Sequence, residues 1–460
     1  MNFFSGLLSR VKNFIFPQAS VQKVFDVSPA ISKNMEDNLS LWYAMYINQP
    51  PWAKEPVIPM GLPSAICREI ARPALAELEI SITGSQRAEY LQDQINRAAH
   101  NFLKQLELGL AVGGIAFRPY FRGNQIFVDA TCATGFSPTK FDPDGTCTGG
   151  VFREKRKVKD SYYIRMEYHD FSDGTETIKN KAFRSDSSWA IRDEVPLGTV
   201  PEWEALPPEA VVENLEEPLF SYFKPPQSNN LETDSPAGVS VYGGATVDLI
   251  RRADEQWDLL RWEFKSSQRK IFMDGTESRA NDFDKRLFEI GFFRPDGNLF
   301  EKFEPTIRDE PIYRGLQDIL RQVEFNVGVS YGTISDPQTI EKTATEVRNS
   351  KWRMFVTINS IQKTLESTIS HLVYAMDVYA DLYHLAPPGD YEVSYSWGDS
   401  VLEDADAKEK ERANDRQDLA AGILNAWEYR MKYHNEDEET AKRMLPKAHD
   451  LTTEEQDDVE

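Results

Sequence analysis

The amino-acid sequence predicts an α+β protein built from several modules. Through residues 31–112 the apolar residues repeat at helical spacing, whereas from residue 115 they alternate as they do in antiparallel strands. A second helical stretch, residues 343–386, contains neither glycine nor proline. The chain has 460 residues, 40% of them hydrophobic, which is too long for one hydrophobic core, so we expect two or more modules.

An N-terminal arm, residues 1–30, precedes the first predicted helix. Phe4, Leu7, Val11 and Phe14 make a short apolar helical face within it. Two roles are open for this arm. It docks on its own fold or on a neighbouring subunit, or it lies on a membrane surface as an amphipathic helix. No apolar run has the length of a membrane span, so we expect no membrane partner.

Residues 31–244 form a mixed module in which helices come first and strands follow. Helices are expected at residues 31–46, 65–78 and 89–112, the last ending at Gly113-Gly114. Alternating segments after that pair predict strands at residues 115–121, 125–130, 149–158, 162–171 and 175–183. Residues 200–240 are rich in Pro, Glu and Asn, which predicts an extended excursion.

Two helices that flank a compact insert come next, like a head on a two-helix stalk. The first spans residues 245–268 and has one apolar face, formed by Ile250, Ala253, Trp257, Leu260 and Phe264. The insert, residues 269–312, is strand-prone, with turn signals at Asp274-Gly275 and Asp296-Gly297. Residues 313–330 are expected to form the second helix.

A loop and a very long helix follow. The loop, residues 331–342, contains Gly332 and Pro337 and few apolar residues, so we expect it to be mobile and weakly packed. Thr343 and Glu346 have the spacing of a capping box and predict a helix over residues 343–386 with one apolar stripe. About 40 residues at a rise of about 1.5 Å make a rod of roughly 60 Å. A rod of this length needs neighbours along its whole length, which favours a subunit of an assembly.

The C-terminal part, residues 387–446, is predicted to contain one strand followed by charged helices. The strand is expected at residues 390–397, and the helices at residues 403–433 and 436–445. Residues 447–460 form an acidic tail that we expect to be disordered.

Composition limits the classes of function that are open to the chain. The net charge is −22, whereas a conventional DNA-binding protein shows a basic surface. The chain therefore either avoids nucleic acid or meets it without holding it tightly. Cys67, Cys132 and Cys147 are odd in number and lack partners at zinc-binding spacing, which indicates reduced thiols in a cytoplasmic setting.

Motifs for catalysis are absent or weak, so we expect no enzyme, no metal and no cofactor. No phosphate-binding G-x-x-x-x-G-K-[ST] loop occurs, and the bare pair Gly113-Gly114 predicts a helix stop and not a dinucleotide site. Asp282 and Asp284 could serve a metal-dependent nuclease, but their neighbours are typical of a solvated helix face. The six histidines are dispersed, and each is interpreted as a polar residue on the face of an element.

An ordered set of sequence blocks resembles the portal proteins of tailed bacteriophages, which form the ring that joins the capsid to the tail. The most specific blocks are EKTATEVRNSKWRMFVTINSIQKTLESTISHLV and GVSVYGGATVDLIRRADEQWDLLRWEFKSSQRKIFM. The others are ISKNMEDNLSLWYAMY, Trp52, GLPSAICREIARPALAELEISI, LELGLAVGGIAFRPYF, FSPTKFDPDG, YYIRMEYHDF, YSWGDSV and DLAAGILNAWEY. The resemblance covers nearly the whole chain but includes no catalytic motif, and it gives no role to the N-terminal arm.

The resemblance implies an architecture, a location and partners. Residues 31–244 would be the wing, the stalk helices the stem, residues 269–312 a small α/β clip, residues 331–342 the tunnel loop, and the helices of residues 387–446 the crown. Such subunits form a closed homo-oligomeric ring, usually of twelve copies, at the capsid vertex of the virion after assembly in the bacterial host cytoplasm. Implied partners are double-stranded DNA, terminase, a head–tail adaptor, and the capsid and scaffolding proteins.

The resemblance also assigns candidate site residues. Residues near the stem end, the clip entry and the tunnel loop would line a DNA channel: Lys265, Arg269, Lys270, Thr333, Ser335 and Lys342. A few basic groups in an acidic protein would guide a duplex without trapping it, because neutralising many phosphates gives tight binding. The alternative is that the basic residues are ordinary solvated helix ends. Apolar residues would pack between subunits: Trp257, Leu260, Phe264, Ile358 and Leu365.

The expected function is therefore a passive DNA conduit and docking platform, for which terminase supplies the energy of packaging. Two alternatives stay open. One is a structural capsid or adaptor protein that encloses no DNA, and the other is a nuclease.

Overall fold

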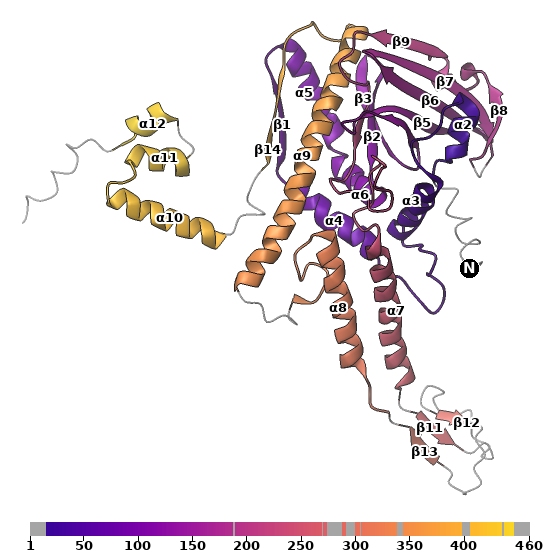
Figure 1. The fold of residues 1–460 in the computed structure, drawn as a ribbon, viewed down its shortest axis with the longest axis vertical. Coiled ribbons are helices and arrows are strands. Elements are labelled where there is room, and N and C mark those ends of the chain that lie inside the picture. Colours follow the sequence, from indigo (N-terminus) through magenta and orange to yellow (C-terminus); the bar gives the residue numbers. More distant parts are fainter. Residues whose placement is uncertain are drawn as a thin grey trace, which may run out of the picture. The chain divides into compact units, whose positions relative to one another are not determined.

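The computed structural model describes residues 15–186, 189–268, 270–273, 288–290, 300–303, 305–337, 344–397, 405–434 and 437–445. The chain divides into two compact units, Met1–Trp397 and Gly398–Glu460. Helices and mostly antiparallel sheets make up the first unit, so the predicted α+β class is confirmed (Figure 1).

The first unit begins with a series of helices. They are α2 (Gln18–Phe25), α3 (Lys33–Tyr46), α4 (Leu62–Leu75), α5 (Gln86–Ala99) and α6 (Phe102–Val112). The hydroxyl of Ser32 accepts the N–H of Met35 at 3.1 Å and so caps α3. The prediction of one helix over residues 89–112 is wrong, because α5 ends at Ala99 and α6 starts at Phe102. His100 and Asn101 separate the two helices, and Asn101 precedes α6 without a side-chain cap.

The first unit also contains three sheets outside the insert of residues 269–312. The strands of two of them follow α6 in the chain, whereas the third pairs a strand before α5 with a strand after the long helix. A six-stranded sheet has the order β4-β5-β6-β7-β8 with β9 on β7, a second has the order β10-β2-β3, and β1 pairs with β14. Their bounds are β1 (Leu78–Thr83), β2 (Ile115–Arg122), β3 (Gln125–Cys132), β4 (Phe136–Phe141), β5 (Cys147–Val158), β6 (Ser161–Ser172), β7 (Thr175–Ser185), β8 (Ile191–Val195), β9 (Glu209–Glu213), β10 (Ser221–Phe223) and β14 (Glu392–Trp397). Two short 3₁₀ helices, η1 (Leu197–Thr199) and η2 (Pro201–Trp203), follow β8. The predicted strands between residues 115 and 183 are confirmed.

The described part of the N-terminal arm docks on the chain's own six-stranded sheet. Phe16 and Val21 are fully buried in one cluster with Val151, Ile164 and Met166. Of the two roles open for the arm, docking on its own fold therefore holds for residues 15–25. Residues 1–14, with the predicted apolar face, lie outside the described residues.

The long helix α9 (Ala344–Leu382) packs along β10 and β2 and against α4 and α5 (Figure 1). Its predicted apolar stripe is confirmed over the buried residues Ile358, Ile361, Leu365, Ile369, Leu372 and Met376. The chain's own sheet and helices cover this stripe. The length of α9 therefore does not by itself require a second subunit.

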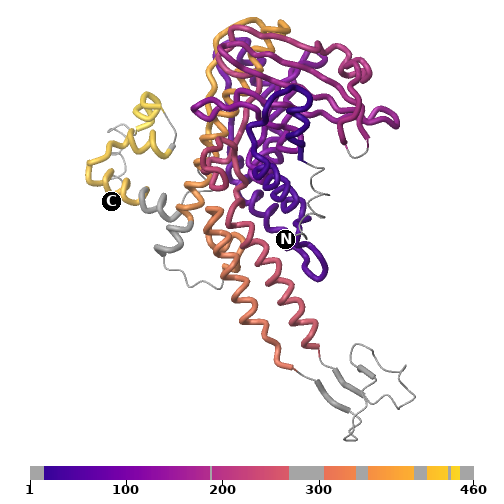
Figure 2. The backbone as a smooth tube through the Cα atoms, turned by 45° about the vertical axis from the view of Figure 1, so that its right-hand side comes forward, coloured from indigo at the N-terminus to yellow at the C-terminus, as the bar shows by residue number. Residues whose placement is uncertain are grey.

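α7 (Ala245–Ser266) and α8 (Asp309–Val327) form an antiparallel pair, seen side by side in Figure 2. Leu260 of α7 and Leu320 of α8 are buried, and Gln256 Nε2 donates to the carbonyl of Ile312 at 3.0 Å. The described strands of the insert are β11 (Lys270–Met273), β12 (Phe288–Ile290) and β13 (Phe300–Phe303), which pair in one small sheet. They agree with the predicted strand-prone insert, whose predicted turns lie outside the described residues.

The second unit contains the helices α10 (Ala405–Ala420), α11 (Ala426–His434) and α12 (Glu438–Arg443). The prediction of one helix over residues 403–433 is wrong, because the chain turns between α10 and α11. Gly422 has φ 74° there, a left-handed conformation that commonly ends helices and costs glycine little. The predicted acidic tail, residues 447–460, lies outside the described residues.

Candidate functional site

The structure describes half of the predicted channel residues well enough to place their side chains. Lys265 is exposed near the end of α7, where the carboxylate of Glu263, two positions earlier, binds the Arg308 guanidinium before α8 at 3.0 Å. Lys270 begins β11, but its side chain is not described, and Arg269 and Lys342 lie outside the described residues. Thr333 and Ser335 follow the opposite end of α8 in the chain, and Ser335 binds Glu324, which lies about 22 Å along the helix from Asp309 at 1.5 Å per residue. Lys265 is therefore not brought together with Thr333 and Ser335 within one chain.

The loop after α8 is packed and not open along residues 331–337, contrary to the prediction. Ser335 is only 4% exposed, and its hydroxyl donates to Glu324 Oε2 at 2.8 Å. The Thr333 hydroxyl donates to the carbonyl of Ser330 at 2.6 Å. The prediction was wrong because it rested on the composition of the loop alone. Polar side chains of α8, Glu324 and Gln317, accept hydrogen bonds from the backbone of the loop.

The residues predicted to pack between subunits separate into two groups. Leu260, Ile358 and Leu365 are buried within the chain, so they have little surface left for another subunit. Trp257 and Phe264 are exposed on α7, by 37% and 50%. Periodicity detected the apolar face of each helix, but it could not tell which part the same chain covers.

α7 also exposes large apolar residues on its other side. Trp262 is 54% exposed and Leu259 is 43% exposed. Trp262 follows the buried Leu260 by two positions, which places it about 200° around an α-helix. Phe264 follows Leu260 by four positions and so lies on nearly the same side as Leu260. α7 therefore exposes apolar side chains on two opposite sides.

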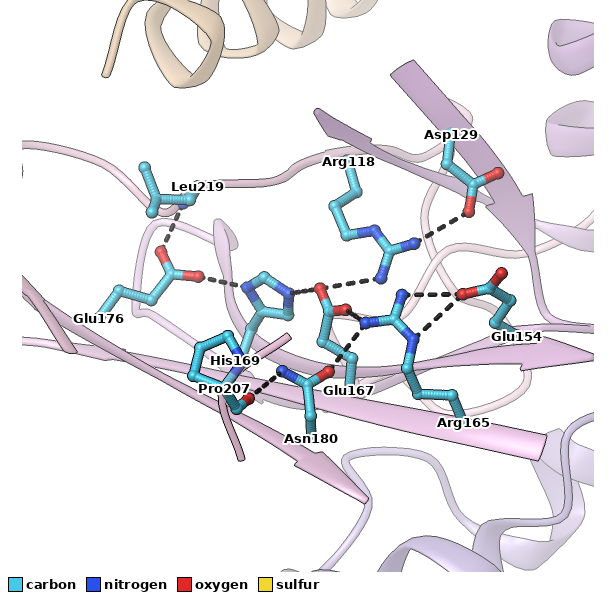
Figure 3. A network of polar contacts seen from close by, with 10 residues as sticks. All are labelled: Arg118, Asp129, Glu154, Arg165, Glu167, His169, Glu176, Asn180, Pro207 and Leu219. Carbon is cyan, nitrogen blue, oxygen red and sulfur yellow. Dashed lines mark hydrogen bonds and ion pairs between the residues drawn. The ribbon is translucent and has the colours of Figure 1, made fainter. Parts of the chain in front are cut away.

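A buried charged cluster that the sequence analysis missed lies on the six-stranded sheet (Figure 3). His169 of β6 is fully buried, with Glu167 Oε1 on Nε2 at 2.8 Å and Glu176 of β7 on Nδ1. Glu167 also binds Arg118 of β2 at 2.8 Å and Arg165 of β6. Outer contacts complete the cluster through Asp129, Glu154, Asn180 and the backbone N–H of Leu219.

The cluster joins elements that are distant in sequence. Arg165, Glu167 and His169 alternate along β6, so they share one face of the strand. This alternation was the available signal, because a polar series on a face that should be buried indicates a network. A hollow of 480 Å³ beside the cluster is lined by charges of both signs, among them Arg118 and Glu167, so it favours neither an anion nor a cation.

The charged neighbours shift the ionisation of the cluster. Burial alone would raise the pKa of Glu167, but Arg118 and Arg165 outweigh burial and hold that pKa well below its usual range. Burial alone would lower the pKa of His169, but hydrogen bonds with Glu167 and Glu176 outweigh it and raise the pKa. Both groups are therefore stabilised in their charged forms, which favours a structural role.

The cluster predicts a particular dependence of stability on pH. Because the pKa of His169 is raised in the fold, protonated His169 stabilises the fold, and this stabilisation is fully present below the unfolded pKa of about 6.5. It is lost as the pH rises through the folded pKa. Because the pKa of Glu167 is lowered in the fold, ionised Glu167 stabilises the fold at pH values above its unfolded pKa. This stabilisation is lost as the pH falls through the folded pKa. Urea unfolding should therefore show that wild type keeps its stability advantage over His169→Gln below about pH 6.5 and loses it as the pH rises above that value.

The exposed His100 provides the control for this measurement. His100→Gln should follow the wild-type curve at every pH, because that side chain lies on the surface. If the curves of wild type and His169→Gln run parallel over the whole range, His169 does not contribute as a cation.

The sequence also led to expectations about the cysteines, metal binding and membrane spans. The three cysteines are free and buried, and burial raises the pKa of each thiol, which makes them poor nucleophiles. Among the described residues, no group of three or more His, Cys, Asp or Glu side chains is arranged to hold a metal ion. Asp282 and Asp284 lie outside those residues. No described helix combines the length and the apolar character that crossing a membrane requires.

No family model matches the chain, and no curated protein gives a sequence match.

Proposed function

We propose that the chain is the subunit of a portal ring at the capsid vertex of a tailed bacteriophage. Double-stranded DNA would pass through the ring during packaging and ejection, and terminase, a head–tail adaptor and the capsid would dock on it. The ordered set of sequence blocks carries the proposal. The order of elements supports it, because an α+β body leads into an antiparallel helix pair with a small sheet as its insert, and then into a long helix.

The two apolar surfaces of α7 support ring formation in particular. A ring is built from head-to-tail contacts, in which one surface of each copy binds a different surface of the next. Such contacts require two complementary surfaces on one subunit, and the sides carrying Trp262 and Phe264 provide two. Exposed aromatic side chains of this size are typical of protein interfaces.

The charge of the chain supports a conduit more than a DNA-binding protein. Duplex DNA carries one negative charge per about 1.7 Å of its axis, so a basic channel would hold it through many phosphate contacts. A chain of net charge −22 that places single cations such as Lys265 at exposed helix ends would limit those contacts. This role requires no catalysis by the chain itself.

Light scattering coupled to size exclusion tests the proposal, together with negative-stain electron microscopy. The purified protein should have a mass many times 52.6 kDa and form rings with a central hole. A stable folded monomer at every concentration would contradict the proposal. Closed assemblies or sheets without a hole would favour the structural capsid or adaptor protein instead.

A further inference from the structure

The carboxylate of Glu324 organises the chain that follows α8. This side chain near the end of α8 is fully buried. Its Oε1 accepts the backbone N–H groups of Gly332, Ile334 and Ser335 at 3.1, 2.6 and 2.8 Å. Its Oε2 accepts the Ser335 hydroxyl at 2.8 Å. One carboxylate thus binds four donors of a single short segment.

The same segment is held at a second place on α8. The Gln317 side-chain oxygen accepts the backbone N–H of Asp336 at 2.7 Å, and the Tyr313 hydroxyl donates to Asp336 Oδ2 at 2.9 Å. Tyr313, Gln317 and Glu324 are four and seven residues apart, so they lie on one face of the helix. The segment therefore turns back along α8 and lies on that face.

α9 holds the start of the segment from the other side. The Arg353 guanidinium lies over the rings of Phe325 and Tyr331, 4.7 and 5.0 Å from their centroids. The Thr357 hydroxyl donates to the carbonyl of Gly328 at 3.0 Å. A Cβ at Gly328 would lie 2.4 Å from that hydroxyl oxygen, so the close approach of the two elements requires glycine.

The order of the segment depends on the Glu324 carboxylate more than on apolar packing. A buried carboxylate is tolerated only when hydrogen bonds replace its hydration, and here the loop supplies four of them. Hydrogen bonds to an ionised acceptor are about twice as strong as neutral ones. An amide at this position would offer the three N–H groups one uncharged acceptor oxygen, and its N–H₂ group would face the Ser335 hydroxyl in place of Oε2.

The chemistry of the fixed segment is unusual for a surface that meets DNA. Residues 331–337, YGTISDP, contain no lysine or arginine, and their one acidic residue, Asp336, is hydrogen-bonded to Tyr313. A segment without cations of its own neutralises no phosphate and adds no salt-dependent affinity, and the neighbouring Arg353 guanidinium lies over the Tyr331 and Phe325 rings. Such a surface can guide a duplex only by its shape, and for this purpose it must be rigid.

We propose that Glu324 is a positioning residue that fixes residues 331–337 on α8, so that this segment presents a rigid guide without cations to the duplex. The proposal rests on the portal function and adds the device that sets the position of the guide. It differs from the expectation of a mobile loop that contacts DNA.

Hydrogen exchange on the purified full chain tests the positioning step without DNA. In Glu324→Gln, the amides of Gly332, Ile334 and Ser335 should exchange at least about tenfold faster than in wild type, because their shared acceptor oxygen loses its charge and forms weaker hydrogen bonds. Glu310→Gln is the matched control, since Glu310 is an exposed acid on the same helix that pairs with Arg314. Ser335→Ala removes one donor and should give a smaller acceleration, which keeps the test available if Glu324→Gln folds poorly.

Particles assembled with each variant test the second step. Rings of Glu324→Gln should form in wild-type yield, whereas the DNA packaged per particle should fall several-fold, and both should stay normal in Glu310→Gln. Unchanged exchange in Glu324→Gln and Ser335→Ala would overturn the positioning role. Faster exchange with normal packaging would overturn the guide. Absence of rings in wild type would instead contradict the portal function, so the two failures are distinguishable.

Discussion

Arg87→Met is expected to lower the free energy of unfolding of the first unit by about 3 kcal/mol. The Arg87 side chain is 1% exposed, and its guanidinium lies at the C-terminal end of α9. It donates to the Asp377 carboxylate at 2.7 Å, to the carbonyls of Asp377, Ala386 and Pro387 at 3.0, 2.8 and 3.1 Å, and to Asp381. Methionine fills a similar volume but satisfies none of these acceptors.

The size of the effect follows from what the substitution leaves behind. Arg87 binds the carbonyls of Ala386 and Pro387 just beyond α9, and a cation near this end of the helix stabilises its dipole. Removing one partner of a buried ion pair costs about 3–5 kcal/mol. The lower value applies here because Asp377 and Asp381 are partly exposed and can be hydrated in the variant.

Urea unfolding of matched variants measures this loss. Arg97→Met on the same helix is the control, because Arg97 is exposed and its substitution should change stability by about 0.5 kcal/mol or less. Arg87→Lys should fall between them, since a lysine keeps the charge but cannot reproduce the planar set of donors. Equal losses in Arg87→Met and Arg97→Met would show that the buried guanidinium does not stabilise the end of α9.

Elements with strong periodicity could be predicted from the sequence. The stripe of α9 and the alternation of β5 to β7 are each repeated many times, and each repeat points to the same structure. The break after Ala99 could not be predicted in the same way, because the connecting residues His100 and Asn101 include neither glycine nor proline. Weak breaks of this kind are decided by packing.

Interactions between distant elements could not be predicted from the sequence, for a different reason. Arg87 meets partners some 290 to 300 residues later in the chain, and Arg118 meets Glu167 of another sheet. Glu324 resembles any polar helix residue until the following loop turns back onto it. The predicted site residues have the same weakness, since Ser335 was assigned to an open loop while its hydroxyl binds Glu324.

The proposed assembly surfaces of α7 give the second large expected effect, which is the loss of the proposed ring. Glutamate in place of Trp262 or Phe264 should prevent assembly, because burying each ring contributes about 2 kcal/mol and a carboxylate there would lose its hydration. Light scattering should then give a mass near 52.6 kDa for each variant. Lys265→Glu is the control, because it places a glutamate on the same helix outside both apolar sides and makes a larger change in charge than either variant, and it should still form rings.

Mixing the two variants tests whether the contact is head-to-tail. Trp262→Glu retains the Phe264 side of α7, and Phe264→Glu retains the Trp262 side. If these two sides bind each other, one copy of each variant can form a single contact and then cannot extend further. The mixture should therefore give a dimer, twice 52.6 kDa, from two proteins that are monomers alone. A mixture that stays monomeric would show that the two sides do not bind each other. Rings formed by either variant alone would show that its substituted side is not needed for assembly.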